Sequence, residues 1–115
     1  MTDADTATAL AALGHEARLK LFRLLVRAGH EGLSIGAIQG HLDIPASTLS
    51  HHLRALVDAG LVHQTRAGRS TLCRADYDRM NGVLAHVAEA CCAGIGPDFP
   101  MAADAIRPST QGATE

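Results

Sequence analysis

The strongest pattern of apolar and polar positions runs from residue 46 to residue 62. Apolar side chains recur there at i, i+4, i+7 and i+8, the spacing of one face of an α-helix. They are Leu49, Leu53, Leu56 and Val57. Pro45 stands just before the stretch and Gly60 near its end, and these residue types are typical of helix starts and stops. The segment is therefore predicted to be an amphipathic helix.

The opposite face of this predicted helix is polar. It comprises Ser47, Ser50, His51, Arg54 and Asp58. Four of these five side chains can donate a hydrogen bond to a base edge or a phosphate oxygen. An ordinary surface helix with a solvated polar face has the same pattern, so the neighbouring segments decide its meaning.

Two helices are predicted before this segment. Residues 1–14 form a short one without a strong cap. Residues 15–29 form a clearer one, with an apolar stripe around Leu21 and Leu25 and a charged face opposite. Gly29 and Gly32 then turn the chain.

A helix-turn-helix precedes and includes the amphipathic segment. Ser34 is a good N-cap for a short helix that runs through His41, and residues 43–45 form a three-residue turn. Two short helices joined by such a turn make a helix-turn-helix, whose second helix enters the major groove of DNA.

A β-hairpin is predicted after Gly60. Residues 61–66 and 70–74 are extended runs, and residues 67–69 form the turn between them. Arg66 and Arg69 lie at or beside the tip. Such a hairpin next to a helix-turn-helix is typical of a wing that reaches a phosphate backbone or minor groove. A solvated hairpin tip is the alternative.

The last predicted helix starts at Asp76 and runs to about Ala93. Its apolar stripe is Met80, Val83, Leu84, Val87, Ala88 and Cys91. Because this stripe is longer than a small core needs, its excess is interpreted as a dimer face. Residues 94–115 are rich in Gly, Pro, Thr and Ala, and we expect a flexible C-terminal tail there.

Composition narrows the class of protein. A chain of 115 residues is one domain, and no run reaches the roughly 18 apolar residues of a membrane span. The acidic N-terminus lacks the features of a signal peptide, so a cytoplasmic protein is expected. The net charge is −2, but residues 47–74 carry four arginines against Asp58 alone, which favours a nucleic-acid partner.

An enzyme is the alternative from another class. The sequence holds no nucleophile elbow, phosphate loop or zinc-protease motif, so no catalytic residues are predicted. A winged helix used only for protein contacts is a further alternative, in which the loss of Arg54, Arg66 and Arg69 would leave function intact.

The order of predicted elements resembles the ArsR/SmtB family of winged-helix repressors. The resemblance is carried by residues 13–25, by the Ser-His-His-Leu string within 47–56, by 59–62 and by the wing at 66–69, and covers roughly residues 8–92. It implies a mainly α fold with a small β-hairpin, a winged helix-turn-helix that dimerises through its terminal helices. The expected domain is residues 1–93.

The resemblance also implies a function. Such a homodimer binds a two-fold symmetric operator and leaves it when an inducer binds, and family members typically repress genes for metal or metalloid resistance. The DNA-facing positions on the recognition helix are then Ser47, Thr48, Ser50, His51 and Arg54, with Arg66 and Arg69 on the wing. Adjacent helix positions point about 100° apart, so His51 is expected to face DNA while His52 packs.

Three cysteines are the candidate sensor. Cys91 and Cys92 are vicinal thiols, which suit thiophilic ions such as As(III) and Sb(III) better than Cd(II) or Zn(II). The third ligand is predicted to be Cys73 of a partner subunit, if the last helices pack antiparallel across the dimer. No constitutive cofactor is expected.

Other interpretations of these residues stay open. Free cysteines often simply pack in the core, and a dithiol can also serve a redox or sulfur-species sensor. The family's arsenic site beside the recognition helix is absent, since residues 33–42 hold no cysteine. Its zinc site on the last helix is matched only poorly. The candidate zinc ligands there are Asp76, Asp78, His86 and Glu89.

Overall fold

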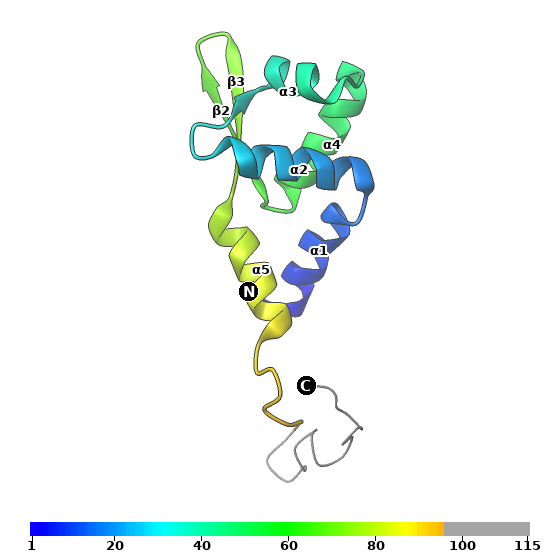
Figure 1. The fold of residues 1–115 in the computed structure, drawn as a ribbon, viewed down its shortest axis with the longest axis vertical. Coiled ribbons are helices and arrows are strands. Elements are labelled where there is room, and N and C mark those ends of the chain that lie inside the picture. Colours follow the sequence, from blue (N-terminus) through cyan, green and yellow to red (C-terminus); the bar gives the residue numbers. More distant parts are fainter. Residues whose placement is uncertain (96–115) are drawn as a thin grey trace.

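The computed structural model describes residues 1–95, which form five helices and a three-stranded antiparallel sheet (Figure 1). The chain runs through α1 (Asp3–Leu13), α2 (Glu16–Ala28), β1 (Leu33–Ser34), α3 (Ile35–Leu42), α4 (Ala46–Asp58), β2 (Val62–Ala67), β3 (Ser70–Ala75) and α5 (Tyr77–Ala88). The expected flexible tail, apart from residues 94 and 95, lies outside the described residues. None of the helices within 1–95 is long and apolar enough to cross a membrane.

Local capping explains where most of the helices begin. The Ser34 hydroxyl accepts a hydrogen bond from the Ala37 N–H at 3.1 Å, which confirms the predicted cap of α3. The first helix is better capped than its sequence suggested, because Thr2 and Asp5 form a reciprocal capping box. Donation from the Thr2 backbone lowers the pKa of the Asp5 carboxyl.

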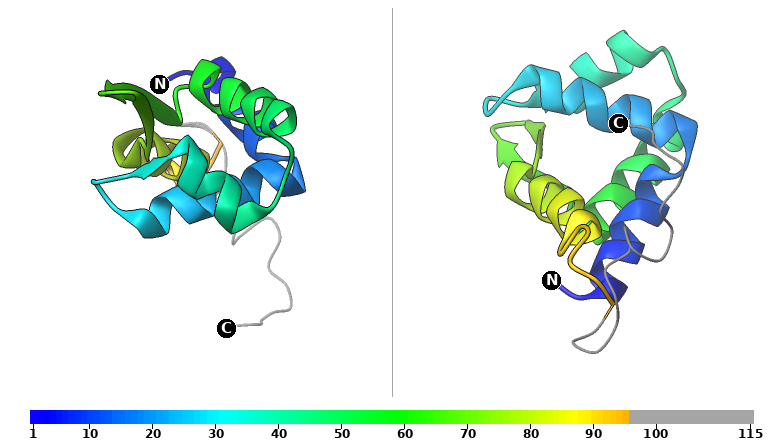
Figure 2. Two further views of the ribbon diagram at one scale, coloured as in Figure 1. Left: turned by 90° about the horizontal axis from the view of Figure 1, so that it is seen from above. Right: turned by 60° about the horizontal axis from the view of Figure 1, so that its bottom comes forward.

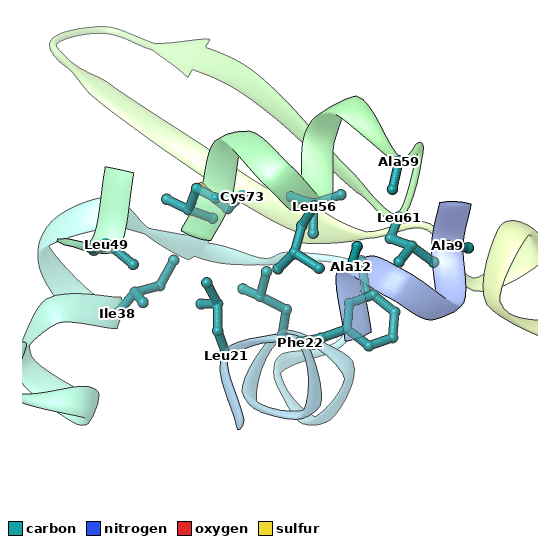
Figure 3. Close-up of a cluster of buried hydrophobic side chains, with 14 of the residues drawn as sticks. Ala9, Ala12, Leu21, Phe22, Ile38, Leu49, Leu56, Ala59, Leu61 and Cys73 are labelled. Carbon is teal, nitrogen blue, oxygen red and sulfur yellow. The ribbon is translucent and has the colours of Figure 1, made fainter. Parts of the chain in front are cut away.

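The core lies between α1, α2, α4 and the sheet (Figure 3). Leu21 and Leu25 of α2 are fully buried, as are Ile38 of α3 and Leu49 and Leu56 of α4. The apolar faces predicted for the second and fourth helices therefore form the centre of the domain. Burying each leucine contributes about 1.5–3 kcal/mol.

The sheet contains one strand more than the sequence predicted. Its order is β1-β3-β2, and the two residues of β1 pair with β3 in the register Leu33 opposite Cys73. Two residues are too few for a period-2 pattern, so β1 could not be read from the sequence. The predicted hairpin is confirmed, with β2 and β3 paired from Val62–Ala75 to Ala67–Ser70.

The last helix is shorter than predicted. It ends at Ala88 instead of Ala93, and Ala90 and Cys92 have positive φ angles of 59° and 64°. Cys91 therefore lies beyond the helix and not on its apolar stripe. Only part of the predicted apolar stripe is buried, because Val83 is buried whereas Leu84 and Val87 are 60% and 63% exposed. The α5 helix runs beside α1 at the end of the domain remote from the hairpin tip (Figures 1 and 2).

We predict that Gly32 tolerates no side chain. Its φ is +73°, and an added Cβ would stand 2.4 Å from the Cys73 carbonyl oxygen, which is fixed in β3. Gly29 has a similar φ of +81° with open space around it, and so is the matched control. Gly32→Ala should lower the free energy of unfolding by about 1–2 kcal/mol more than Gly29→Ala, measured by urea unfolding. Equal losses would show that the close approach to β3 is unimportant.

Candidate nucleic-acid interface and thiol site

The recognition helix presents its polar face outward. Every residue predicted to face DNA on α4 is exposed: Ser47, Thr48, Ser50, His51 and Arg54. Arg54 lies 3.6 Å from Asp58 in an ion pair whose two side chains are 81% and 68% exposed. Such an exposed pair contributes little stability, so the Arg54 guanidinium can exchange this partner for a phosphate.

The beginning of α4 is also open. Pro45 is its N-cap residue and provides no side-chain hydrogen bond to the first turn. Backbone N–H groups at a helix N-terminus attract anions, so this end of the recognition helix suits a phosphate oxygen. The turn before it is held by Gln39, whose side-chain amide donates to the Ile44 carbonyl at 3.2 Å.

The two adjacent histidines of α4 have different environments. His51 is exposed, whereas His52 is 6% exposed and belongs to the buried face. This confirms the prediction that one ring is available and the other packs. The burial of His52 lowers its pKa, and the nearby His15 and Arg18 add to that effect.

A residue that the sequence did not single out holds His52 in place. Arg18 of α2 donates from Nε to His52 Nδ1 at 3.3 Å and from a terminal nitrogen to the Ala12 carbonyl at 3.5 Å. His15 completes the group, with its ring centroid 4.9 Å from that of His52. Arg18 looked like one more charged residue of an amphipathic helix, and only tertiary packing reveals its partners.

The wing arginines are available to a ligand. Arg66 on β2 and Arg69 in the turn are exposed, and Gly68 beside them has a positive φ of 65° that the two-residue turn requires. Neither guanidinium forms an ion pair among residues 1–95. Their contact with DNA stays a prediction, as does that of the α4 residues.

The four candidate zinc ligands do not gather at one point, although His86 Nδ1 lies 3.9 Å from Glu89 Oε1. Asp76 caps α5, lies 2.7 Å from His63 Nε2, and has a lowered pKa chiefly because the Arg79 N–H donates to it. His86 Nε2 lies 2.7 Å from Asp3 Oδ1 of α1. Within residues 1–95, no three His, Cys, Asp or Glu side chains gather as metal ligands.

Cys73 does not suit the role predicted for it. Its side chain is 0% exposed and lies in the core with Leu56 (Figure 3). Burial raises the pKa of its thiol, which disfavours the thiolate that binds metal ions. The Gln64 amide also donates to its sulfur at 3.6 Å. Within the subunit, Cys73 is therefore a core residue of β3.

Cys91 and Cys92 are accessible and close together. Both are exposed, and their Sγ atoms lie 3.5 Å apart just after the end of α5. The hydrogen bond between the two sulfurs raises the pKa of the Cys92 thiol. The structure therefore presents one two-thiol group and one separate buried thiol in place of the predicted set of three.

These features define a class of protein. A helix-turn-helix of α3 and α4 followed by the β2–β3 hairpin, with exposed hydrogen-bond donors on α4 and arginines on the hairpin, is a winged helix-turn-helix.

Comparisons with known proteins agree. A family described as "Helix-turn-helix domain" matches residues 13–65. A Halobacterium salinarum protein named for repression of an arsenical resistance operon is 40% identical over 60 residues, 52% of this chain and 46% of that protein. The match thus spans about half the length of this curated relative.

Solved structures match over more of the chain. An ArsR-like transcriptional regulator from Rhodococcus sp. RHA1 is 29% identical with a TM-score of 0.67, over 78% of this chain and 81% of that one. A homodimeric winged helix-turn-helix DNA-binding domain from Mycobacterium bovis is 24% identical with a TM-score of 0.62, over 79% and 90%. The chain is therefore similar in sequence and fold to ArsR-like winged-helix transcriptional regulators.

We predict that two of the three thiols react in the native protein and that the third does not. Cys91 and Cys92 are exposed and should react with a disulfide reagent in the native protein, whereas Cys73 should react only after unfolding. A spectrophotometric thiol count should therefore give two rapid equivalents without denaturant and three with it. Cys73→Ser should leave the rapid phase unchanged, and three rapid equivalents would contradict the buried placement of Cys73.

Proposed function

We propose that the protein is a homodimeric repressor that binds operator DNA through α4 and the wing and leaves it when a thiophilic ion binds Cys91 and Cys92. The single observation that carries the DNA-binding part is the division of α4, whose apolar face fills the core while every polar candidate stays exposed. The inducer part rests on the two exposed thiols beyond α5.

DNA binding follows from the chemistry of the exposed residues. Short hydroxyl side chains at Ser47 and Ser50 allow α4 to approach the base edges closely, while His51 and Arg54 are long enough to reach bases or phosphates. Arg66 and Arg69 supply positive charge on the wing. The phosphate contacts provide affinity, and the contacts of α4 with base edges provide specificity.

A homodimer is supported by the apolar surface that α1 and α5 leave uncovered. Leu10 of α1 is 43% exposed, and Leu84 and Val87 of α5 are more than half exposed. The Mycobacterium bovis domain of the same fold is described as homodimeric. Burying these side chains against a second copy would remove apolar area from water and place two recognition helices for a two-fold symmetric operator.

The inducer that best suits the thiol pair is As(III) or Sb(III). Each arsenic–sulfur bond forms as a thiol gives its proton to a hydroxide of As(OH)3, which leaves as water. Two thiols 3.5 Å apart can bind one ion in this way, and the third position keeps its hydroxide. A name that refers to arsenical resistance belongs to the Halobacterium relative and supports the same choice. Soft Cd(II) is a poorer candidate, and Zn(II) is poorer still.

A redox or sulfur-species sensor is the second candidate. The observation that favours it is the same exposed dithiol, which an oxidant can convert to a disulfide with loss of two electrons and two protons. A disulfide between adjacent residues is strained, so a bridge to another thiol is the easier product.

We predict that the wing arginines set the salt dependence of DNA binding. In Arg66→Ala/Arg69→Ala, the slope of log affinity against log salt should fall by about 0.9 for each phosphate that the variant no longer neutralises. The measurement is fluorescence anisotropy with the protein's own upstream DNA between about 50 and about 200 mM salt. Arg23→Ala/Arg27→Ala removes equal charge from the exposed face of α2 and should change the slope much less. Equal changes in the two variants would contradict a specific role for the wing.

We predict that metalloid release of DNA requires both thiols beyond α5. Arsenite or antimonite should lower the affinity of the wild-type protein for the upstream DNA about 30- to 150-fold, the range of a coupling of about 2–3 kcal/mol. Cys91→Ser/Cys92→Ser should bind DNA normally and resist release, whereas Cys73→Ser should respond like the wild type. Zinc, cadmium and peroxide serve as parallel additions. Release of the double variant by metalloid would contradict the thiol site, and release of the wild type by peroxide alone would favour the redox candidate.

A further inference from the structure

The contact between Arg18 and His52 lies beneath the recognition helix and joins three helices. Arg18 belongs to α2, His52 to the buried face of α4, and the Ala12 carbonyl that Arg18 also contacts belongs to α1. His52 is only 6% exposed, so water cannot replace this contact. The group therefore links the position of α4 to the helices behind it.

The geometry requires neutral imidazoles. His52 accepts the Arg18 Nε–H with Nδ1, and His15 accepts the Ala17 N–H with Nδ1 at 3.3 Å to cap α2. A protonated imidazole has an N–H on both nitrogens and accepts no hydrogen bond. Protonation of His52 would also place a positive charge against the Arg18 guanidinium.

We propose that Arg18 and His52 are positioning residues for DNA recognition, which hold α4 in its binding orientation only while His52 is neutral, so that acidification weakens DNA binding. The inference rests on the proposed function for its DNA part. His15 contributes as the neighbour whose ring centroid lies 4.9 Å from that of His52 and whose Nδ1 accepts the hydrogen bond that caps α2.

The charges around His52 all act in one direction. The titratable and charged groups that face it are Arg18 of α2, His15 at the N-cap of α2, and His51 of α4 itself. Neither His52 nor any of these three neighbours forms an ion pair with a carboxylate among residues 1–95. The nearby Arg54 is paired with Asp58, and Glu16 is paired with Lys20. No acidic side chain in the described chain therefore compensates a protonated His52.

The sign of the pH dependence follows from linkage. Burial lowers the pKa of His52 in the folded protein below its ordinary value of 6.5. The unfolded chain therefore takes up the proton first as the pH falls, and the stability that neutral His52 contributes is lost from about pH 6.5 downwards. It is fully present above that pH.

Protonation of His51, the exposed ring beside His52, would change DNA binding in the opposite direction. His51 lies on the polar face of α4, and its protonation would add a positive charge towards the phosphates. Acidification should therefore strengthen binding if His51 dominates and weaken it if the Arg18–His52 contact dominates. The direction of the change separates the two effects.

The test measures DNA affinity of the full chain at about pH 7.5 and about pH 5.0 at constant ionic strength, because the pKa of His52 is lowered and its protonation needs the more acidic solution. The wild type should bind its upstream DNA at least about twofold more weakly at the lower pH. His52→Asn retains an acceptor near the place of Nδ1 but cannot be protonated, so its binding should not weaken. The exposed His41 lies on α3, and His41→Asn should behave like the wild type. Stronger or unchanged wild-type binding at the lower pH, or weakening that persists in His52→Asn, would overturn the proposal.

Two measurements without DNA keep this test separate from that of the proposed function. The thermal unfolding midpoint of the wild type should fall between the two pH values by more than that of His52→Asn. NMR of the wild-type imidazoles, which needs no variant, should show unprotonated Nδ1 on His52 and a midpoint of titration below the ordinary value of 6.5. If no DNA is bound at any pH, the proposed function fails while these readouts still decide the contact. A His52 ring that titrates at or above about 6.5 would overturn it.

Discussion

Burial of one face of α4 is the constraint on which the rest of the structure depends. Leu49, Leu53 and Leu56 are at most 2% exposed and pack against α2, α1 and β2. At about 1.5–3 kcal/mol each, these three leucines outweigh the exposed Arg54–Asp58 pair, which contributes less than about 1 kcal/mol. The apolar face therefore fixes the rotation of the helix about its axis. The polar face is left exposed, free of any requirement from folding, and can be used to read DNA.

The hairpin combines an anchored base with a free tip. Cys73 in β3 is buried in the core and pairs with both β1 and β2, whereas β2 is exposed beyond Val62 and Arg69 lies in the outer turn. Near the base, the Asp76 N–H donates to the Leu61 carbonyl at 2.8 Å and the Tyr77 hydroxyl donates to the Val26 carbonyl at 3.1 Å. The inner end of the wing is thus fixed to both α2 and α5, and only its outer end can adapt to a ligand.

Features marked by a local pattern of residues were predictable from the sequence, and features set by tertiary contacts were not. The faces of α2 and α4, the cap at Ser34 and the hairpin all follow from local patterns. The two-residue strand β1 exists only because β3 passes beside it. The true end of α5 was missed because apolar residues continue past Ala88 while the backbone leaves the helical region at Glu89.

The thiols were likewise predictable from the sequence only in part. Vicinal cysteines are visible in a sequence, and Cys91 and Cys92 are both exposed in the structure. The third cysteine, Cys73, could be assigned to the core or to a shared site only by knowing which side of β3 faces the core. Successive residues of a strand point to opposite faces of the sheet, so a shift of one position decides whether the side chain is buried. Arg18 was missed for a related reason, since its partners Ala12 and His52 lie in two other helices.

The placement of the thiols bears on how an ion could act on distant DNA. Cys91 and Cys92 follow the end of α5, while its N-cap Asp76 contacts His63 at the base of the wing. A helix of 12 residues is about 18 Å long, so α5 spans the distance between the two sites as one rigid element. Its other neighbour is α1, which contacts α5 where His86 meets Asp3 and which contacts Arg18 through the Ala12 carbonyl.

A ligand shifts an equilibrium only through a difference in affinity between two conformations. In this fold the conformations that could differ are the positions of α5 against α1 and against the wing. Each of these positions includes a pair of exposed or half-buried charged groups, His86 with Asp3 and His63 with Asp76, beside the buried packing of Val83. The polar pairs are the parts that can change while the domain stays folded.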